Sequence, residues 1–170
     1  MARTRFTVPH DLAQLLRTDN YPGMIPAESI PMRGFIYHHG GEFDELWFDF
    51  RVGEAANPGD QVEEAVRRVW AKVTRMRPDM VAWKAPDQAT IVEAKEELEN
   101  SGIWQLKTYA DAYRAEFPAH KVRLVAVAQR ANQTALNLAR EAGVAVYLYT
   151  MASGIPDIAA TPLEGDANGV

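Results

Sequence analysis

The alternation of apolar and polar residues is clearest in the second half of the chain, where it predicts a hairpin. Residues 77–83 and 89–92 are short runs rich in β-type residues, and they flank the segment 84–88. Pro86 and Asp87 in that segment are turn formers. The simplest local structure is therefore an antiparallel hairpin.

A strand, a helix and a second strand are predicted farther along the chain. They cover residues 122–128, 132–142 and 144–149, and a strand-helix-strand unit of this length implies a right-handed crossover between parallel strands. Residues 96–100 are predicted to form a solvated acidic connector after the hairpin. The helix that follows it has a core stripe made of Ile103, Leu106, Ala110, Tyr113 and Phe117.

The first half of the chain is less regular. Prolines interrupt residues 1–32, which we predict to be an N-terminal arm with one short helix over 11–17. Residues 33–38 and 45–52 are expected to form an N-terminal hairpin. In its second strand Leu46, Phe48 and Phe50 are expected to share one face.

A helix is predicted over residues 61–75, after a break at residues 57–60. Its apolar stripe consists of Val62, Ala65, Val66, Val69 and Val73. Taken together, the elements predict one α/β domain over 33–150, a mixed sheet with helices on both faces, and a flexible C-terminal tail over 151–170.

Composition and charge limit the classes of protein. A chain of 170 residues with 47% hydrophobic content is long enough for one substantial core, and the lack of cysteine excludes disulfides and thiolate zinc sites. No apolar run approaches the length of a membrane span, so we expect no membrane partner and a cytoplasmic location. A net charge of −5 argues against a broad basic surface for nucleic acid.

The predicted hairpin sets a pair of carboxylates against each other. The midpoint between Asp79 and Glu93 is residue 86, so a symmetric hairpin places these two side chains across from each other, and Lys95 shares the face of Glu93. Two like charges at this separation raise each other's pKa. A bound divalent cation removes the conflict, and hard oxygen ligands suit Mg²⁺ or Mn²⁺.

Pro78-Asp79 together with Glu93-x-Lys95 resembles the PD-(D/E)xK nuclease superfamily. Gln105 and Tyr109, which follow on the next predicted helix, resemble the Q-x-x-x-Y motif of its RecB-like branch. The resemblance covers about residues 60–150. It implies a restriction-endonuclease-like α-β-β-β-α-β core, here with an N-terminal hairpin and a C-terminal α-β extension, in which the strand over 45–52 takes the place of the strand usually found after the first helix.

The resemblance also implies an activity, a Mg²⁺-dependent deoxyribonuclease, and roles for individual residues. Asp79, Glu93 and the Ala94 carbonyl would hold Mg²⁺ or Mn²⁺, and Lys95 would position or deprotonate the attacking water. Gln105 and Tyr109 would contact the phosphate or support the site. The extra acidic residue that the superfamily often carries on its first helix is expected at Glu63.

A cluster of basic residues lies before and within this proposed site, and we predict that it contacts DNA. Its members are Arg67, Lys72, Arg75, Arg77 and Lys84. The alternative is that these residues only form the solvated face of an amphipathic helix.

A second function remains open from the sequence. The acidic chain lacks a helicase or ATPase domain within its 170 residues, and this favours a structural or docking module that keeps the nuclease fold with little or no catalysis. The resemblance then admits a homo-oligomer, a phage particle or a DNA-processing assembly as the setting.

Overall fold

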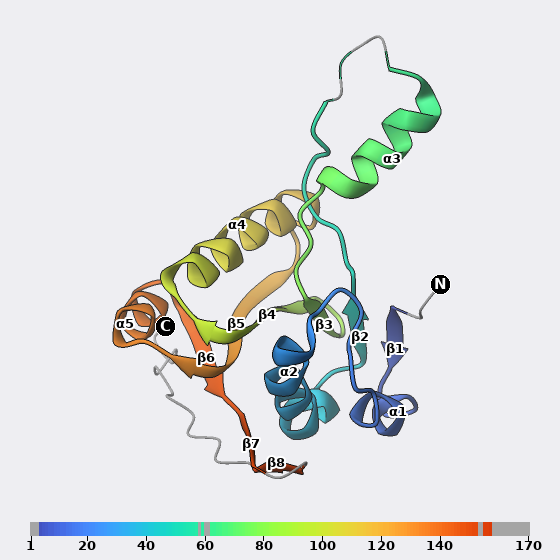
Figure 1. The fold of residues 1–170 in the computed structure, drawn as a ribbon. Helices are drawn as coiled ribbons and strands as arrows, with labels where there is room; N and C mark the ends of the chain where they lie inside the picture. The colour runs from blue at the N-terminus through green and yellow to red at the C-terminus, as the bar shows by residue number, and fades with distance from the viewer. Residues whose placement is uncertain (1–3, 58, 60–61, 153–154, 158–170) are drawn as a thin grey trace.

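The computed structural model describes residues 4–57, 59, 62–152 and 155–157, with the backbone alone for 71–73, 151–152 and 155–157. Six strands form one open mixed sheet in the order β1-β2-β3-β4-β5-β6 (Figure 1). The strands of this sheet are β1 (Arg5–Thr7), β2 (Glu45–Phe48), β3 (Met80–Lys84), β4 (Gln88–Leu98), β5 (Lys121–Ala131) and β6 (Val144–Leu148). The helices are α1 (Leu12–Leu16), α2 (Pro26–His39), the one-turn η1 (Gly40–Glu42), α3 (Glu64–Thr74), α4 (Asn100–Glu116) and α5 (Gln133–Glu141).

The predicted α/β class is confirmed, and so is the crossover. Strands β1 to β4 pair antiparallel, whereas β4, β5 and β6 pair parallel. The side chain of Asn132 accepts a hydrogen bond from the Ala135 amide and caps the start of α5. Gly143, with φ of +68°, follows the end of that helix and leads into β6.

The predicted hairpin is also confirmed, with the register worked out from the sequence. Met80 lies opposite Val92, and Lys84 lies opposite Gln88. Continuing this register by one residue sets Asp79 opposite Glu93. The two carboxylates therefore meet at the end of the hairpin that is farthest from its turn.

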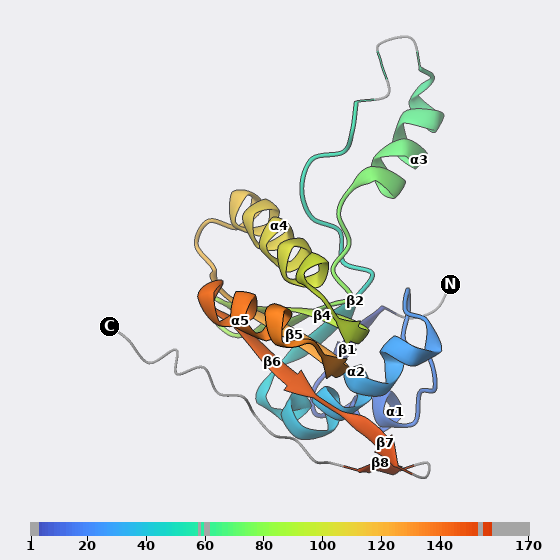
Figure 2. The same cartoon turned by 60° about the vertical axis from the view of Figure 1, so that its left-hand side comes forward.

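Two hydrophobic cores lie on the two faces of the sheet (Figures 1 and 2). Helix α2 covers one face together with α1, and α4 and α5 cover the other. Successive residues of β4 and β5 point into alternate cores: Val92 and Ala94 belong to the α2 side, whereas Ile91 belongs to the α4 side. Both strands are thus buried on both faces, as their continuous apolar runs require.

The expected N-terminal hairpin is wrong, because residues 33–38 belong to α2. Pro26 stands at the first turn of this helix, where its missing N–H is not needed. Pro31 lies inside the helix and leaves the Ala27 carbonyl without its usual helical donor. Gln129 of β5 donates to that carbonyl at 2.9 Å, so a tertiary contact replaces the lost helical bond.

The expectation of an N-terminal arm over 1–32 is wrong for its described part. Phe6, Leu15, Tyr21 and Met32 are buried in the α2 core. The Tyr21 ring stacks on Phe48 at 5.2 Å between centroids. These apolar residues are scattered between prolines, so they show no periodic stripe in the sequence although each reaches the core. The short helix expected over 11–17 is present as α1.

Two other expectations for the strands need correction. Phe50 does not share the face of Leu46 and Phe48, because Asp49 has φ of +54° and turns the chain, so that Phe50 packs against the α4 core. Residues 96–98 are not a connector but the end of β4. Glu96 and Glu97 bind Arg130 of the neighbouring strand, which explains an acidic run at an exposed strand end.

Helix α3 is present where a helix was predicted, but its apolar stripe is not buried. Val66 is 50% exposed and Val69 is 63% exposed. Figures 1 and 2 show α3 standing away from the sheet, on a segment that leaves after β2 and returns before β3.

The predicted C-terminal tail lies mostly outside the described residues. Within its described part, β7 (Thr150–Ala152) pairs antiparallel with β8 (Ile155–Asp157). No described helix combines the length and the apolar character of a membrane span.

Candidate active site

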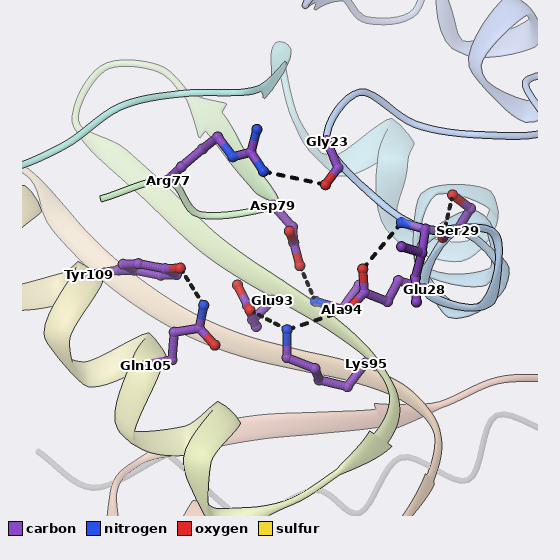
Figure 3. A network of polar contacts seen from close by, with 11 residues as sticks. Gly23, Glu28, Ser29, Arg77, Asp79, Glu93, Ala94, Lys95, Gln105 and Tyr109 are labelled. Atoms are coloured by element: carbon purple, nitrogen blue, oxygen red, sulfur yellow. Dashed lines mark hydrogen bonds and ion pairs between the residues drawn. The ribbon is translucent and has the colours of Figure 1, made fainter. Parts of the chain in front are cut away.

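The candidate site lies where the β3–β4 hairpin meets the first turn of α2 and the second and third turns of α4 (Figure 3). Asp79 precedes β3, and Glu93 and Lys95 are two residues apart on β4. Gln105 and Tyr109 reach the same place from α4. The structure thus brings five of the six predicted catalytic residues together.

Glu93 is the most buried charged group of the site, with 1% of its surface exposed. Its Oε1 accepts a hydrogen bond from Lys95 Nζ at 2.6 Å. Its Oε2 is buried and has no hydrogen-bond partner among the described residues. Burial first, and then the negative charge of Asp79, raises the pKa of Glu93 from its ordinary 4.5 to about 8.

Asp79 is half-buried beside it. Its Oδ2 accepts a hydrogen bond from the Ala94 amide at 2.8 Å, and no described hydrogen bond uses its Oδ1. Burial raises the pKa of Asp79, while the Ala94 amide and the charge of Lys95 oppose the rise. Both pKa values are thus raised, with burial as the first cause for each, and the charge of Asp79 contributes to the rise at Glu93.

Lys95 carries the positive charge of the site. Burial alone would lower the pKa of its amine, but the carboxylates of Glu93, Asp79 and Glu28 together raise it above the ordinary value. The amine consequently stays protonated at neutral pH. Of the two roles predicted for Lys95, this charge favours positioning a water over deprotonating it.

Gln105 and Tyr109 lie one turn apart on α4 and touch each other, because Gln105 Nε2 donates to the Tyr109 hydroxyl. The Tyr109 side chain is buried. Burial, followed by the nearby charge of Glu93, raises the pKa of its hydroxyl. Both side chains therefore form the α4 wall of the site.

Glu28 is a site residue that the sequence reading missed. It lies on the first turn of α2, with Oε1 at 3.6 Å from Lys95 Nζ and Oε2 accepting a hydrogen bond from the Ile25 amide at 3.3 Å. Pro26 followed by Glu28 is a signal for a helix start, and it could have revealed both α2 and this carboxylate.

Glu63 does not belong to the site. It is exposed and stands at the start of α3, which extends away from the sheet. The sequence predicted residues 33–38 of α2 as a strand, so it gave no reason to look for a carboxylate on that helix.

The predicted DNA-contacting residues are spread over the molecule. Arg77 lies nearest to the site: it binds the Asp49 carboxylate at 3.3 Å and the Gly23 carbonyl at 3.5 Å, and its charge opposes the rise in the pKa of Asp79. Lys84 lies at the turn, five residues along β3 from Asp79, or about 16 Å away.

The other three predicted DNA contacts belong to the segment that carries α3. Arg75 donates to the Gly53 carbonyl and forms an ion pair with Glu116 of α4. Arg67 lies on α3, and the Lys72 side chain lies outside the described residues.

The residues fit a hard divalent cation in part. Two acidic side chains meet at the hairpin end, and the Glu93 Oε2 atom is buried without a donor, as a metal ligand would be. Within the part of the chain that the structure describes, however, no group of three or more acidic, histidine or cysteine side chains is arranged to hold an ion. Mg²⁺ is often bound by only one or two carboxylates and keeps several waters, so two suffice in principle.

The chain matches no protein-family model, no curated protein and no solved structure.

Proposed function

We propose that the protein is a metal-dependent phosphodiesterase that hydrolyses DNA. The observation that carries this proposal is the Asp79–Glu93 pair, set in register by the hairpin, in which one buried oxygen of Glu93 lacks a hydrogen-bond donor. Two facing carboxylates with raised pKa values destabilise a packed core, whereas a bound cation offsets their charge.

The order of elements supports the same proposal. Helix α2, strands β2, β3 and β4, helix α4 and strand β5 follow one another in the order α-β-β-β-α-β, with α3 inserted between β2 and β3. This is the order expected for the PD-(D/E)xK nuclease core. The first helix is thus α2, and Glu28 on it approaches the site where Glu63 was expected.

The roles of the residues follow from their charges. Asp79, Glu93 and the Ala94 carbonyl would hold Mg²⁺ or Mn²⁺, which when bound activates water and offsets charge on a phosphate. The Lys95 ammonium orients the water and stabilises the negative charge that develops on the phosphorus oxygens. Glu28 keeps Lys95 charged and in place. Gln105 and Tyr109 support Glu93 or contact the phosphate.

Incubation of plasmid DNA with Mn²⁺, with and without EDTA, tests the proposal. We expect the wild-type protein to cut the plasmid and EDTA to abolish the cutting. The Asp79→Asn and Lys95→Ala variants should cut at least about a hundredfold more slowly, because each substitution removes a charge at the reacting phosphate. Asp87→Asn is the matched control, since Asp87 lies in the hairpin turn and pairs with Lys121. Equal cutting by Asp79→Asn and Asp87→Asn would refute the proposed site.

A docking module with the same fold is the second candidate. It is favoured by the lack, among the described residues, of three acidic or histidine side chains arranged to hold an ion, and by the Lys95 amine that already occupies one oxygen of Glu93. If no divalent metal supports cutting and Mn²⁺ does not raise the melting temperature, this second function replaces the first.

A further inference from the structure

Exposed apolar side chains gather on the segment that carries α3. Val66, Val69 and Trp70 are 50%, 63% and 43% exposed, and Met76 just beyond the helix is 37% exposed. Four of the seven exposed large hydrophobic side chains found among the described residues thus lie on this segment. A concentration of this kind marks an interaction surface.

The spacing of the apolar residues points to another helix as the partner. Within α3, Val66, Val69 and Val73 recur at intervals of three and four residues. This is the heptad spacing of a helix whose seam faces a second helix. Among the described residues, no helix covers Val66 or Val69, which are half or more exposed.

Two segments, residues 52–56 and 74–76, connect α3 to the sheet and hold the helix away from it. The backbones of Val52 and Met76 exchange two hydrogen bonds, and the Thr74 hydroxyl accepts one from the Ala56 amide. The Arg75 side chain binds both the Gly53 carbonyl and Glu116. These contacts fix both connecting segments, so α3 stays away from the sheet and its apolar side chains remain exposed.

The charges on α3 are arranged so that two copies of the helix can pair opposite charges. Glu63 and Glu64 stand at the start of α3, and three basic residues follow on the helix with no acidic residue among them: Arg67, Arg68 and Lys72. Two copies that run antiparallel bring the acidic start of each helix beside the basic end of the other, whereas parallel copies set like charges together.

We infer that α3 is a dimerisation arm that packs antiparallel on α3 of a second copy of this chain. The inference stands on the exposed seam and its charges, and it does not depend on the proposed nuclease activity. A helix of 11 residues is about 16 Å long. A pair of such helices buries less than the ~1,200–2,000 Å² of stable interfaces, so the dimer is weak and depends on concentration.

Sedimentation velocity of the full chain over a wide concentration range tests the inference. We expect a monomer–dimer equilibrium whose dissociation constant rises at least about tenfold in Val69→Glu, because the charge is then buried in the seam twice. Tyr37→Glu is the matched control: it changes another exposed hydrophobic residue, on α2, and leaves the equilibrium as it is. A wild-type monomer at all concentrations, or a dimer indifferent to Val69→Glu, overturns the inference.

Cysteine crosslinking tests the orientation, since the chain has no cysteine of its own. In an antiparallel pair, Trp70→Cys, beside the seam and near the helix centre, forms a disulfide between copies under mild oxidation, whereas Ala65→Cys, beside the seam at the helix start, does not. Equal crosslinking of both variants overturns the antiparallel arrangement. Circular dichroism of each variant shows that its helices are retained, so the failure of a crosslink is not a failure to fold.

Discussion

Glu93 is an acid that folding forces into a poor environment for its charge. In the folded protein the Glu93 carboxyl keeps its proton up to about pH 8, whereas in the unfolded chain it releases the proton near pH 4.5. Between these values the folded state binds more protons, so the stability of the metal-free protein falls as the pH rises from 5 to 8. The raised pKa of Asp79 acts in the same direction.

We predict that Glu93→Gln weakens this pH dependence, because the amide has no proton to lose. Urea unfolding at pH 5 and pH 8, followed by tryptophan fluorescence, measures the effect. The wild-type protein should lose on the order of a few kcal/mol more between the two pH values than the variant does. Identical losses in both proteins would show that Glu93 is not the titrating group.

Mn²⁺ should act on the same proton. A cation that binds Glu93 needs the carboxylate ionised, so its binding releases a proton and tightens as the pH rises toward and past 8. We predict a larger rise in melting temperature with Mn²⁺ at pH 8.5 than at pH 6, measured by calorimetry. The shift should disappear in Asp79→Asn, and a shift that is larger at pH 6 would contradict the assignment.

Glu28 is expected to support the charge of Lys95. Removing its negative charge in Glu28→Gln should lower the pKa of the Lys95 amine toward its ordinary value and slow DNA cutting about tenfold. The amine can be titrated by NMR, a readout that does not depend on catalysis. Glu141→Gln, at the exposed end of α5, is the control, and an unchanged Lys95 titration in Glu28→Gln would remove this role.

At this scale the sequence predicts what depends on local register. Asp79, Glu93 and Lys95 are tied by one short hairpin, and Gln105 and Tyr109 by one helical turn, so their relative positions follow from chain geometry alone. Glu28, on α2, lies more than fifty residues before Asp79 in the chain. Nothing local to the hairpin indicates that approach.

At the scale of elements, Gly34 lets α2 pack closely on the residue that follows β6. A Cβ atom at this position would lie 2.5 Å from the Tyr149 ring. We predict that Gly34→Ala destabilises the protein by about 1–3 kcal/mol in urea unfolding, in spite of the better helix propensity of alanine.

Gly41→Ala is the matched control for this change. No atom lies within 4 Å of a Cβ at Gly41, so this substitution should leave the free energy of unfolding almost unchanged. If the two variants lose equal stability, the contact between α2 and Tyr149 is not the cause.

The sequence predicts best the elements whose apolar pattern and end signals lie within the element itself. β5 and β6 have continuous apolar runs, and α5 between them has a clear end at Gly143, so all three are predicted within a few residues of their bounds. Helix α2 was missed because Pro31 suggests a break, whereas its cost is offset by Gln129, a residue from a distant strand. A single-sequence pattern cannot contain that contact.

At the scale of the whole molecule, the sheet with its two cores and the α3 segment are separable. No described residue of α3 belongs to either core, and the segment leaves and returns beside the Val52–Met76 pair. The sequence predicted the helix but not its exposure, because an apolar stripe indicates burial without saying whether the partner is the same chain.

We predict that the α3 segment can be excised without loss of the fold. Replacing residues 53–75 by Asn-Gly joins Val52 to Met76 through a two-residue turn, which suits this antiparallel pair because the two backbones exchange both hydrogen bonds. The shorter loop also costs less entropy to close. Calorimetry should find one cooperative transition within a few degrees of the wild-type melting temperature.

Leu106→Ala, in the core under α4, is the contrast for this deletion, and its cost should be about 2–5 kcal/mol. The excised protein should also be monomeric at every concentration, since it has lost the arm that we infer to pair. A deletion variant that melts as low as Leu106→Ala would show that α3 contributes to the stability of the sheet after all. A deletion variant that stays folded but still dimerises would contradict the pairing assigned to α3 and leave the described fold intact.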